Sequence, residues 1–162
     1  MPSLRPYQPK DWPHFLALDL ETAQDALGDA PESERATLRE RWPKVLAEKR
    51  RFTPESFADP RAELWILESD TGEYLGHLWL SLKEGPLSGA KLLEVTTMGL
   101  VKSQRGKGLG RLLMQKAETA AKEKGIELIE LSVAGNNRRA RDLYRDLGYE
   151  TTRRTMRKRL RG

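Results

Sequence analysis

Residues 92–125 read LLEVTTMGLVKSQRGKGLGRLLMQKAETAAKEKG, and this stretch decides the fold. Its first part, Leu92 to Val101, is rich in Leu, Val and Thr, which favour a largely buried strand. Three glycines then occupy alternate positions, Gly106, Gly108 and Gly110. From Leu109 the apolar residues recur at helical spacing as far as Gly125, which suits the left-handed end of a helix. The stretch therefore predicts a strand, a glycine-rich turn and a helix.

The glycines stand where the predicted helix begins. A helix N-terminus carries N–H groups without partners and the positive end of the helix dipole, so it favours anions. Glycine has no Cβ to obstruct the approach of a ligand to those N–H groups. Three cations accompany them, Arg105, Lys107 and Arg111. These features predict a cradle for a phosphate or pyrophosphate.

Three glycine-rich motifs compete for this loop. A P-loop needs Ser or Thr after its Gly-Lys, but Gly108 follows Lys107. A dinucleotide fingerprint needs a third glycine where Arg111 stands. The pattern Arg-x-x-Gly-x-Gly is satisfied by Arg105, Gly108 and Gly110. In this the sequence resembles the GNAT superfamily of N-acetyltransferases, whose acetyl-CoA pyrophosphate loop has the same pattern.

A second match follows at the spacing that the family shows. Residues 137–149, NRRARDLYRDLGY, resemble its next motif, in which an Asn is followed by a Tyr seven residues on and then by Leu-Gly-aromatic. The two motifs cover residues 92 to 150. The resemblance implies that two strands splay apart and that acetyl-CoA occupies the space between Thr96–Val101 and Leu131–Ala134.

The resemblance also implies which residues bind acetyl-CoA. They are Met98, Gly99, Leu100, Val101, Arg105, Gly106, Lys107, Gly108, Leu109, Gly110, Arg111, Asn137, Arg141 and Tyr144. Asn137 is equally suited to cap the helix that it precedes. Arg138, Arg139 and Arg141 can meet phosphates or form an exposed helix face, and Arg141 is preferred because it lies one turn after Asn137.

Two side chains are candidates for the chemistry of acetyl transfer. Tyr144 stands at the family's position for the acid that protonates the departing thiolate, and it can otherwise be a core residue of its helix. Glu94 is the candidate base, because some family members carry a glutamate there and a partly buried carboxylate is the stronger base. The alternative is an exposed glutamate beside Lys91. Strand alternation is expected to put Glu94 on one face with Thr96, Met98 and Leu100.

The rest of the chain predicts a mixed α/β sheet of about six to seven strands, with about four helices on its two faces, as one GNAT-like domain over residues 1–162. The other strands are expected at Leu4–Tyr7, Glu63–Glu68, Tyr74–Lys83, Glu127–Val133 and Tyr149–Leu160. Two helices are expected between the first and second of these strands, one from Trp12 to a break at Gly28–Pro31 and one from about Glu32 to Arg51. Thr53–Pro60 is expected to be a loop. His77, Trp79 and Ser81 are expected on a half-exposed strand face, with lining of the acceptor pocket as the alternative.

Composition excludes several classes of site. The absence of cysteine excludes disulfides, thiolate metal sites and an acyl-cysteine intermediate, and two histidines are too few for a metal cluster, so no metal is expected. The chain shows neither a bilayer-spanning apolar run nor a secretory start, so a cytoplasmic protein without membrane contact is expected.

Charge is unevenly distributed around the net value of +5. Residues 11–34, here called the acidic segment, hold acids and no Lys or Arg, and in the GNAT fold this region borders the acceptor. The end of the chain, RRTMRKRLRG, is basic. We expect an edge strand there, with Met156 and Leu160 inward, rather than a nucleic-acid-binding patch.

These features favour an acetyl-CoA-dependent N-acetyltransferase that uses direct attack in a ternary complex on a cationic amine, either a small molecule or a peptide end. Two alternatives remain open at this point. The first is a non-catalytic CoA-binding module of the same fold, and the second is a basic nucleic-acid-binding protein. A homodimer is compatible with either enzyme or module.

Overall fold

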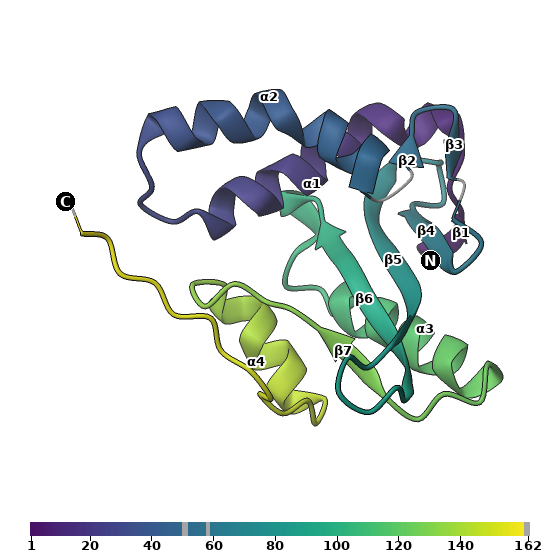
Figure 1. Cartoon of the computed structure of the whole chain (residues 1–162). Helices are drawn as coiled ribbons and strands as arrows, with labels where there is room; N and C mark the ends of the chain where they lie inside the picture. Colours follow the sequence, from purple (N-terminus) through teal and green to yellow (C-terminus); the bar gives the residue numbers. More distant parts are fainter. Residues whose placement is uncertain (50–51, 58, 161–162) are drawn as a thin grey trace.

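The computed structural model describes residues 1–49, 52–57 and 59–160, and its centre is a five-stranded sheet (Figure 1). The strands lie in the order β1-β4-β5-β6-β7. Their bounds are β1 Ser3–Pro6, β4 Ala62–Glu68, β5 Tyr74–Glu84, β6 Lys91–Leu100 and β7 Ile129–Leu131. Neighbouring strands are antiparallel from β1 to β6, whereas β7 runs parallel to β6. The α/β class expected from the sequence is confirmed.

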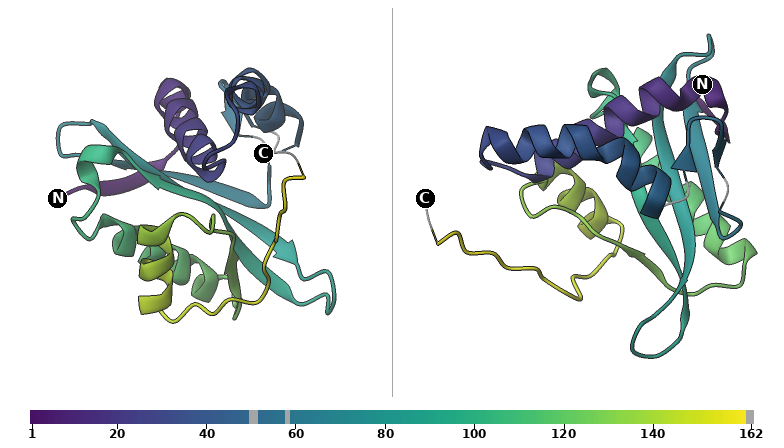
Figure 2. Two further views of the ribbon diagram at one scale, coloured as in Figure 1. Left: turned by 90° about the vertical axis from the view of Figure 1, so that its left-hand side faces the viewer. Right: turned by 45° about the horizontal axis from the view of Figure 1, so that its top comes forward.

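Helices cover both faces of this sheet, as the left view of Figure 2 shows. One face carries α1 (Trp12–Ala26) and α2 (Glu32–Lys49), and the other carries α3 (Leu109–Glu123) and α4 (Arg138–Asp146). Short 3-10 turns at Pro9–Asp11 and Lys102–Gln104 precede α1 and α3. Alternation along β5 sends Leu78 and Leu80 to the α3 side and Trp79 to the α1 side, so each face has a core of its own.

The two cores differ in composition. Beneath α1 the core is aromatic, with the Phe15 and Phe52 rings 4.8 Å apart and the Phe52 and Trp79 rings 5.6 Å apart. Beneath α3 it is mostly aliphatic, with Tyr144 as its buried aromatic residue, and the helix contributes three buried alanines, Ala117, Ala120 and Ala121. Small side chains on the buried stripe let α3 lie close to the sheet, which fixes the position of the loop that precedes the helix.

A β-bulge interrupts the pairing of β5 with β6. Trp79 is opposite Thr97, but the next residue of β5, Leu80, is opposite Val95, so Thr96 is the extra residue. The bulge reverses the faces of the residues beyond it. Met98 and Leu100 pack in the core beneath α3, whereas Glu94 and Thr96 are on the α1 side. The expectation that all four share one face is therefore wrong, because simple alternation does not hold across a bulge.

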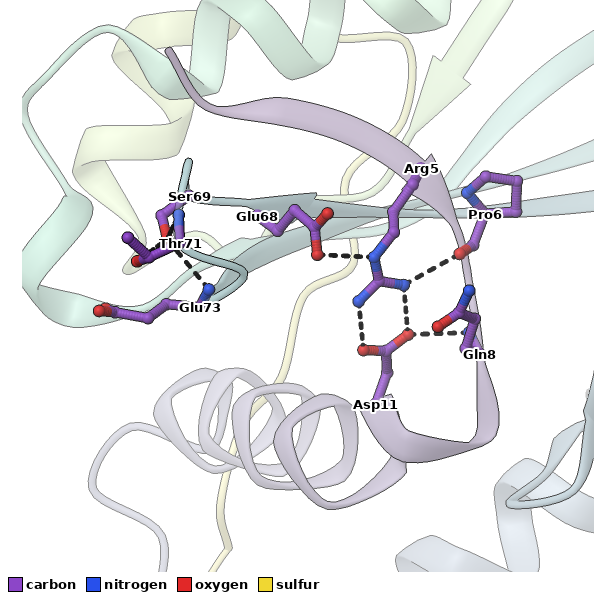
Figure 3. Close-up of polar contacts among 8 residues, drawn as sticks. All are labelled: Arg5, Pro6, Gln8, Asp11, Glu68, Ser69, Thr71 and Glu73. Atoms are coloured by element: carbon purple, nitrogen blue, oxygen red, sulfur yellow. Dashed lines mark hydrogen bonds and ion pairs between the residues drawn. The ribbon is translucent and has the colours of Figure 1, made fainter.

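A buried ion pair ties the start of the chain to α1 (Figure 3). Both terminal nitrogens of Arg5 donate to the Asp11 carboxylate at 2.8 Å, and Arg5 Nε donates to Glu68 at 2.7 Å. Asp11, at 3% exposure, also accepts from the Gln8 backbone N–H. Burial raises the pKa of Asp11, but the hydrogen bonds from Arg5 and Gln8 outweigh it and hold that pKa below its ordinary value. The pair anchors α1 across the outer strands of the sheet.

The strand predicted over Tyr149–Leu160 is wrong. Residues 149–160 form no strand, and residues 150–160, here called the C-terminal tail, are all exposed. The tail leaves α4 and runs as an extended segment toward the start of α2, where Arg159 donates to Glu34 at 2.8 and 3.1 Å (Figures 1 and 2). Only Met156 and Leu160 are large apolar residues in the tail, and both are exposed, so little apolar burial is available to hold it on the sheet. The main sheet has five strands instead of the six to seven expected.

Two further expectations need correction. The segment expected as a loop contains a small hairpin, in which β2 (Phe52–Thr53) pairs with β3 (Ser56–Phe57). The predicted end of the second helix, Arg51, lies outside the described residues, and α2 is described as far as Lys49.

Within the described part of the chain, the helices are all too short or too polar to cross a membrane.

Candidate active site

The glycine loop, residues 105–110, joins the end of β6 to the start of α3. Gly106 and Gly108 have φ angles of +79° and +81°, a backbone conformation that side chains with a Cβ rarely adopt. The first helical bond runs from the Leu112 N–H to the Gly108 carbonyl at 3.3 Å. Among the described residues, the N–H groups of residues 106–111 have no hydrogen-bond partner. This is the arrangement that the sequence predicts for an anion cradle.

Gly110 has a second physical role. A Cβ built on Gly110 would lie 3.0 Å from Leu143 Cδ2, so α4 packs tightly against the first turn of α3. The missing side chain therefore allows the two helices to approach each other as well as leaving the backbone open.

The cations around the glycine loop point in different directions. Lys107 is exposed and has no ion pair with any described residue. Arg111 pairs with Asp146 at 3.4 Å. Arg105 is turned toward α1, because its Nε donates to the Leu100 carbonyl and its Nη2 donates to Glu21, each at 3.1 Å. Of the three cations predicted for phosphate, Lys107 is thus the one left without a partner in the described part of the chain.

Arginines of α4 complete the positive surroundings. Arg141 Nη1 donates to the Gly135 carbonyl at 2.9 Å, so it supports the turn before α4. Arg139 Nη1 is 3.4 Å from the place where a Cβ of Gly106 would be. The sequence names Arg138, Arg139 and Arg141 as candidates and favours Arg141. It does not single out Arg139, because the orientation of α4 toward the loop depends on the contact between Leu143 and Gly110.

The pairing of β6 with β7 stops halfway along β6. Their register covers three pairs and ends at Val95 opposite Leu131. Beyond it β6 continues through Thr96–Leu100 with no strand of the described residues paired to it on that side, and we call this opening the pairing gap. The Val101 N–H donates to the Leu75 carbonyl of β5, so alternation directs the backbone groups of Met98 and Leu100 toward the pairing gap. Those of Gly99 point to β5.

Helix α4 borders the pairing gap on the α3 side. Asn137 caps the helix, its Oδ1 accepting from the Ala140 N–H at 3.2 Å. Tyr144 is buried in the core beneath α3, with its ring 5.9 Å from that of Tyr149. Burial and the neighbouring Tyr149 raise the pKa of Tyr144 to about 12. Its hydroxyl has no hydrogen-bond partner among the described residues.

Glu94 lies on the opposite face of the sheet from Tyr144, two residues before Thr96, where the pairing gap begins. It is opposite Ser81 in β5, and its side chain is 33% exposed. Its Oε1 accepts from Thr96 Oγ1 at 3.2 Å and is 3.5 Å from Lys83 Nζ. Glu94 and Tyr144 therefore lie on opposite faces of the sheet, Glu94 on the α1 side and Tyr144 in the core beneath α3.

His77 and Trp79 are buried, not half-exposed. They are 1% and 2% exposed beneath α1, and the His77 ring is 4.6 Å from the Phe15 ring. Tyr74 Oη and His77 Nδ1 are hydrogen-bonded at 2.6 Å. Burial lowers the pKa of His77 to about 4, and nearby Asp19 opposes that shift only in part. The expectation of a half-exposed strand face failed because α1 covers it.

Most of the acidic segment is paired within the protein. Asp11 binds Arg5, buried Asp19 accepts from Trp42 and Thr97, and the others with partners are Glu21 with Arg105, Glu32 with Arg39 and Glu34 with Arg159. Asp25 and Asp29 remain, near the end of α1, and neither forms an ion pair with a described residue. The Asp25 carbonyl accepts from Asn136 Nδ2 at 2.9 Å, which joins this end of α1 to the turn before α4.

Comparison with known proteins identifies the family. The profile of the acetyltransferase (GNAT) family matches residues 24–149, which is most of the chain and includes the glycine loop, the pairing gap and α4. The chain belongs to the GNAT acetyltransferase family.

Individual GNAT relatives agree with the fold described above. The N-acetyltransferase YdgE of Bacillus subtilis, itself uncharacterized, is 38% identical over 96 residues, which is 59% of this chain and 60% of that protein. A GCN5-related N-acetyltransferase of Ralstonia eutropha superposes with a TM-score of 0.74 at 20% identity, covering 98% of each chain. An acetyltransferase of Clostridium acetobutylicum, solved with acetyl-CoA, gives a TM-score of 0.64 at 17% identity, covering 99% of this chain and 97% of that one. At these sequence identities, the likeness to the two structures shows the GNAT fold alone.

Proposed function

We propose that this protein transfers an acetyl group from acetyl-CoA to a cationic primary amine by direct attack in a ternary complex. One observation carries the proposal: the pairing gap opens directly beside the glycine loop, with Tyr144 on one face and Glu94 on the other. Membership of the GNAT family and the acetyl-CoA in the Clostridium acetobutylicum structure support the choice of acetyl donor.

Acetyl-CoA would be held by groups that this chain leaves available. The free N–H groups at the start of α3 suit the pyrophosphate, and Lys107 and Arg139 add positive charge there. The N–H and C=O groups of Met98 and the N–H of Leu100 suit the amides of pantetheine, whereas the Leu100 carbonyl already accepts from Arg105. In this arrangement Arg105 and Arg141 act indirectly, since Arg105 binds the end of β6 and Arg141 binds the turn before α4.

The chemical step needs a base for the amine and an acid for the leaving thiolate. We assign proton abstraction from the ammonium form of the acceptor to Glu94, approached from the α1 face. The neutral amine then attacks the thioester carbonyl, the C–N bond forms and the C–S bond breaks. We assign protonation of the sulfur to Tyr144, whose phenol carries its proton at neutral pH, as a tyrosine ordinarily does. The second proton of the nitrogen leaves as the amide forms and, passed on through water, restores the phenol that has protonated the sulfur.

The acceptor is proposed to be cationic because Asp25 and Asp29 keep free carboxylates where α1 meets the turn before α4. A cleft whose entrance carries one sign of charge raises the rate at which ligands of the opposite charge encounter it. Polyamines, aminoglycosides and basic peptide ends are the classes to test.

The test has two stages. Calorimetry with acetyl-CoA measures binding, and release of free CoA thiol in the presence of the amine panel measures transfer. Binding together with acceptor-dependent release is the expected result. Binding without release for any amine would identify a non-catalytic CoA-binding module, and absence of binding at about millimolar acetyl-CoA would reject both.

A further inference from the structure

We propose that Thr96, held from behind by Ser81, is a positioning residue that fixes the Glu94 carboxylate for proton abstraction. The inference rests on the proposed function, in which Glu94 is the base. It concerns a hydroxyl chain on the α1 face of β5 and β6 that neither the glycine-loop motif nor the α4 motif contains.

The β-bulge makes this arrangement. Because Thr96 is the extra residue of β6, Thr96 and Thr97 both direct their hydroxyls to the α1 face, where alternation would allow only one of them. Their partners differ. Thr96 Oγ1 contacts Ser81 and Glu94, whereas Thr97 Oγ1 donates to buried Asp19 at 3.0 Å.

The direction of the hydrogen bonds follows from proton counting. A threonine hydroxyl has one proton, and that of Thr96 is donated to Glu94 Oε1 at 3.2 Å. The 2.6 Å contact between Ser81 Oγ and Thr96 Oγ1 therefore requires Ser81 to donate. The chain runs from Ser81 through Thr96 to Glu94. Ser81 is only 8% exposed, so the donor end of the chain is sheltered from water.

The hydrogen-bonded hydroxyls and Lys83 act on the same oxygen of the Glu94 carboxylate. Lys83 Nζ is 3.5 Å from Glu94 Oε1, and no hydrogen bond in the described part of the protein uses Oε2. Holding Oε1 on one side restricts the rotation of the side chain and leaves Oε2 to accept the proton of the amine. A base that is held in its reactive orientation reacts faster than one that must find it.

The experiment is a double-mutant cycle between position 96 and position 94, read as kcat and KM for the amine acceptor at saturating acetyl-CoA. We expect Thr96→Val to lower kcat roughly 10-fold, the size of a lost hydrogen bond to a charged group, with acetyl-CoA affinity unchanged. Thr96→Ser, which keeps the hydroxyl, should restore kcat. In a Glu94→Gln background, Thr96→Val should change kcat less than about 2-fold, because the residue that it positions is no longer a base.

Thr97→Val is the matched control, since it makes the same change at the next residue but breaks a bond to Asp19. Its effect should be the same with Glu94 or Gln at position 94. Equal effects of Thr96→Val in the two backgrounds, or failure of Thr96→Ser to restore kcat, would overturn the positioning role and leave the proposed function intact. Absence of transfer by the wild-type protein to every amine would overturn both.

Discussion

Tyr144 is the side chain whose removal gives the cleanest test of the proposed chemistry. Its hydroxyl makes no hydrogen bond to a described residue, so Tyr144→Phe keeps the ring in the core beneath α3 and its contact with Tyr149. We expect kcat to fall roughly 100-fold, the usual size of a lost general acid, and acetyl-CoA affinity to stay the same. Steady-state kinetics and calorimetry measure the two quantities. Wild-type turnover in the variant would reduce Tyr144 to a packing residue.

His77 predicts a specific dependence of stability on pH. Its pKa is about 4 in the folded protein and near 6.5 when unfolded, so the unfolded chain binds the extra proton first. The stability that the neutral ring provides is complete above about pH 6.5 and is lost as the pH falls toward 4.

The measurement is urea unfolding of the wild type and of His77→Gln at about pH 7.5 and about pH 5. Between those values the wild type should lose roughly 2 kcal/mol more than the variant, because only the wild type must protonate a buried ring. Comparing the two proteins cancels the carboxylates that titrate in both. A parallel pH dependence would show that His77 stays protonated or exposed in solution.

Single residues also show how far the sequence could lead. The motifs identified the glycine loop, Asn137 and Tyr144, because each belongs to a local pattern. The closeness of Arg139 to Gly106, and the change of face at Thr96, depend on how α4 and β5 pack, and no spacing within one element reveals them. His77 was misjudged for the same reason, since its burial comes from α1.

At the scale of elements, the start of α3 is the part that the pyrophosphate should contact. Lys107 is the suitable probe because it is exposed and has no ion pair with a described residue, so its replacement leaves the fold intact. We expect Lys107→Glu to weaken acetyl-CoA binding roughly 10-fold by reversing a charge beside the phosphates. Lys122→Glu, the same change at the far end of α3, should have no effect. Equal affinities in the two variants would place the phosphates elsewhere.

Substitution of the glycines would be harder to interpret. Gly108 has a positive φ, and a side chain on Gly110 would push against Leu143. Either change therefore strains the backbone or separates α3 from α4, as well as covering the N–H groups.

The elements that sequence reasoning found best are those with strong periodicity. The strand, loop and helix of residues 92–125 have their expected order, with α3 from Leu109 to Glu123. Tyr149–Leu160 failed because charge and threonine alone do not make a strand; pairing requires apolar burial, and the tail offers two apolar side chains that stay exposed. The β2–β3 hairpin was missed because its strands have two residues each.

At the scale of the whole molecule, opposite charges meet where the tail approaches α2. Arg159 pairs with Glu34, and their side chains are 40% and 45% exposed. An exposed pair of this kind contributes little to stability. Its significance is that the C-terminal tail places cations beside the acidic segment. Under the proposed function, the charge that an acceptor meets would then depend on residues of the tail as well as on those of the acidic segment.

The acceptor is therefore expected to respond to the acids that the protein itself leaves unpaired, Asp25 and Asp29. Replacing both with Asn should lower kcat/KM for a cationic amine roughly 3- to 10-fold through a higher KM, because the encounter rate falls, and leave the KM for acetyl-CoA unchanged. Raising the ionic strength should lower kcat/KM of the wild type and have less effect on the variant, since salt screens the charges that were removed. Glu123→Gln with Glu127→Gln is the matched control, two exposed acids with the same spacing at the other end of the molecule. A wild-type kcat/KM that is insensitive to salt, or a preferred acceptor that is anionic, would show that these carboxylates only solvate the end of α1.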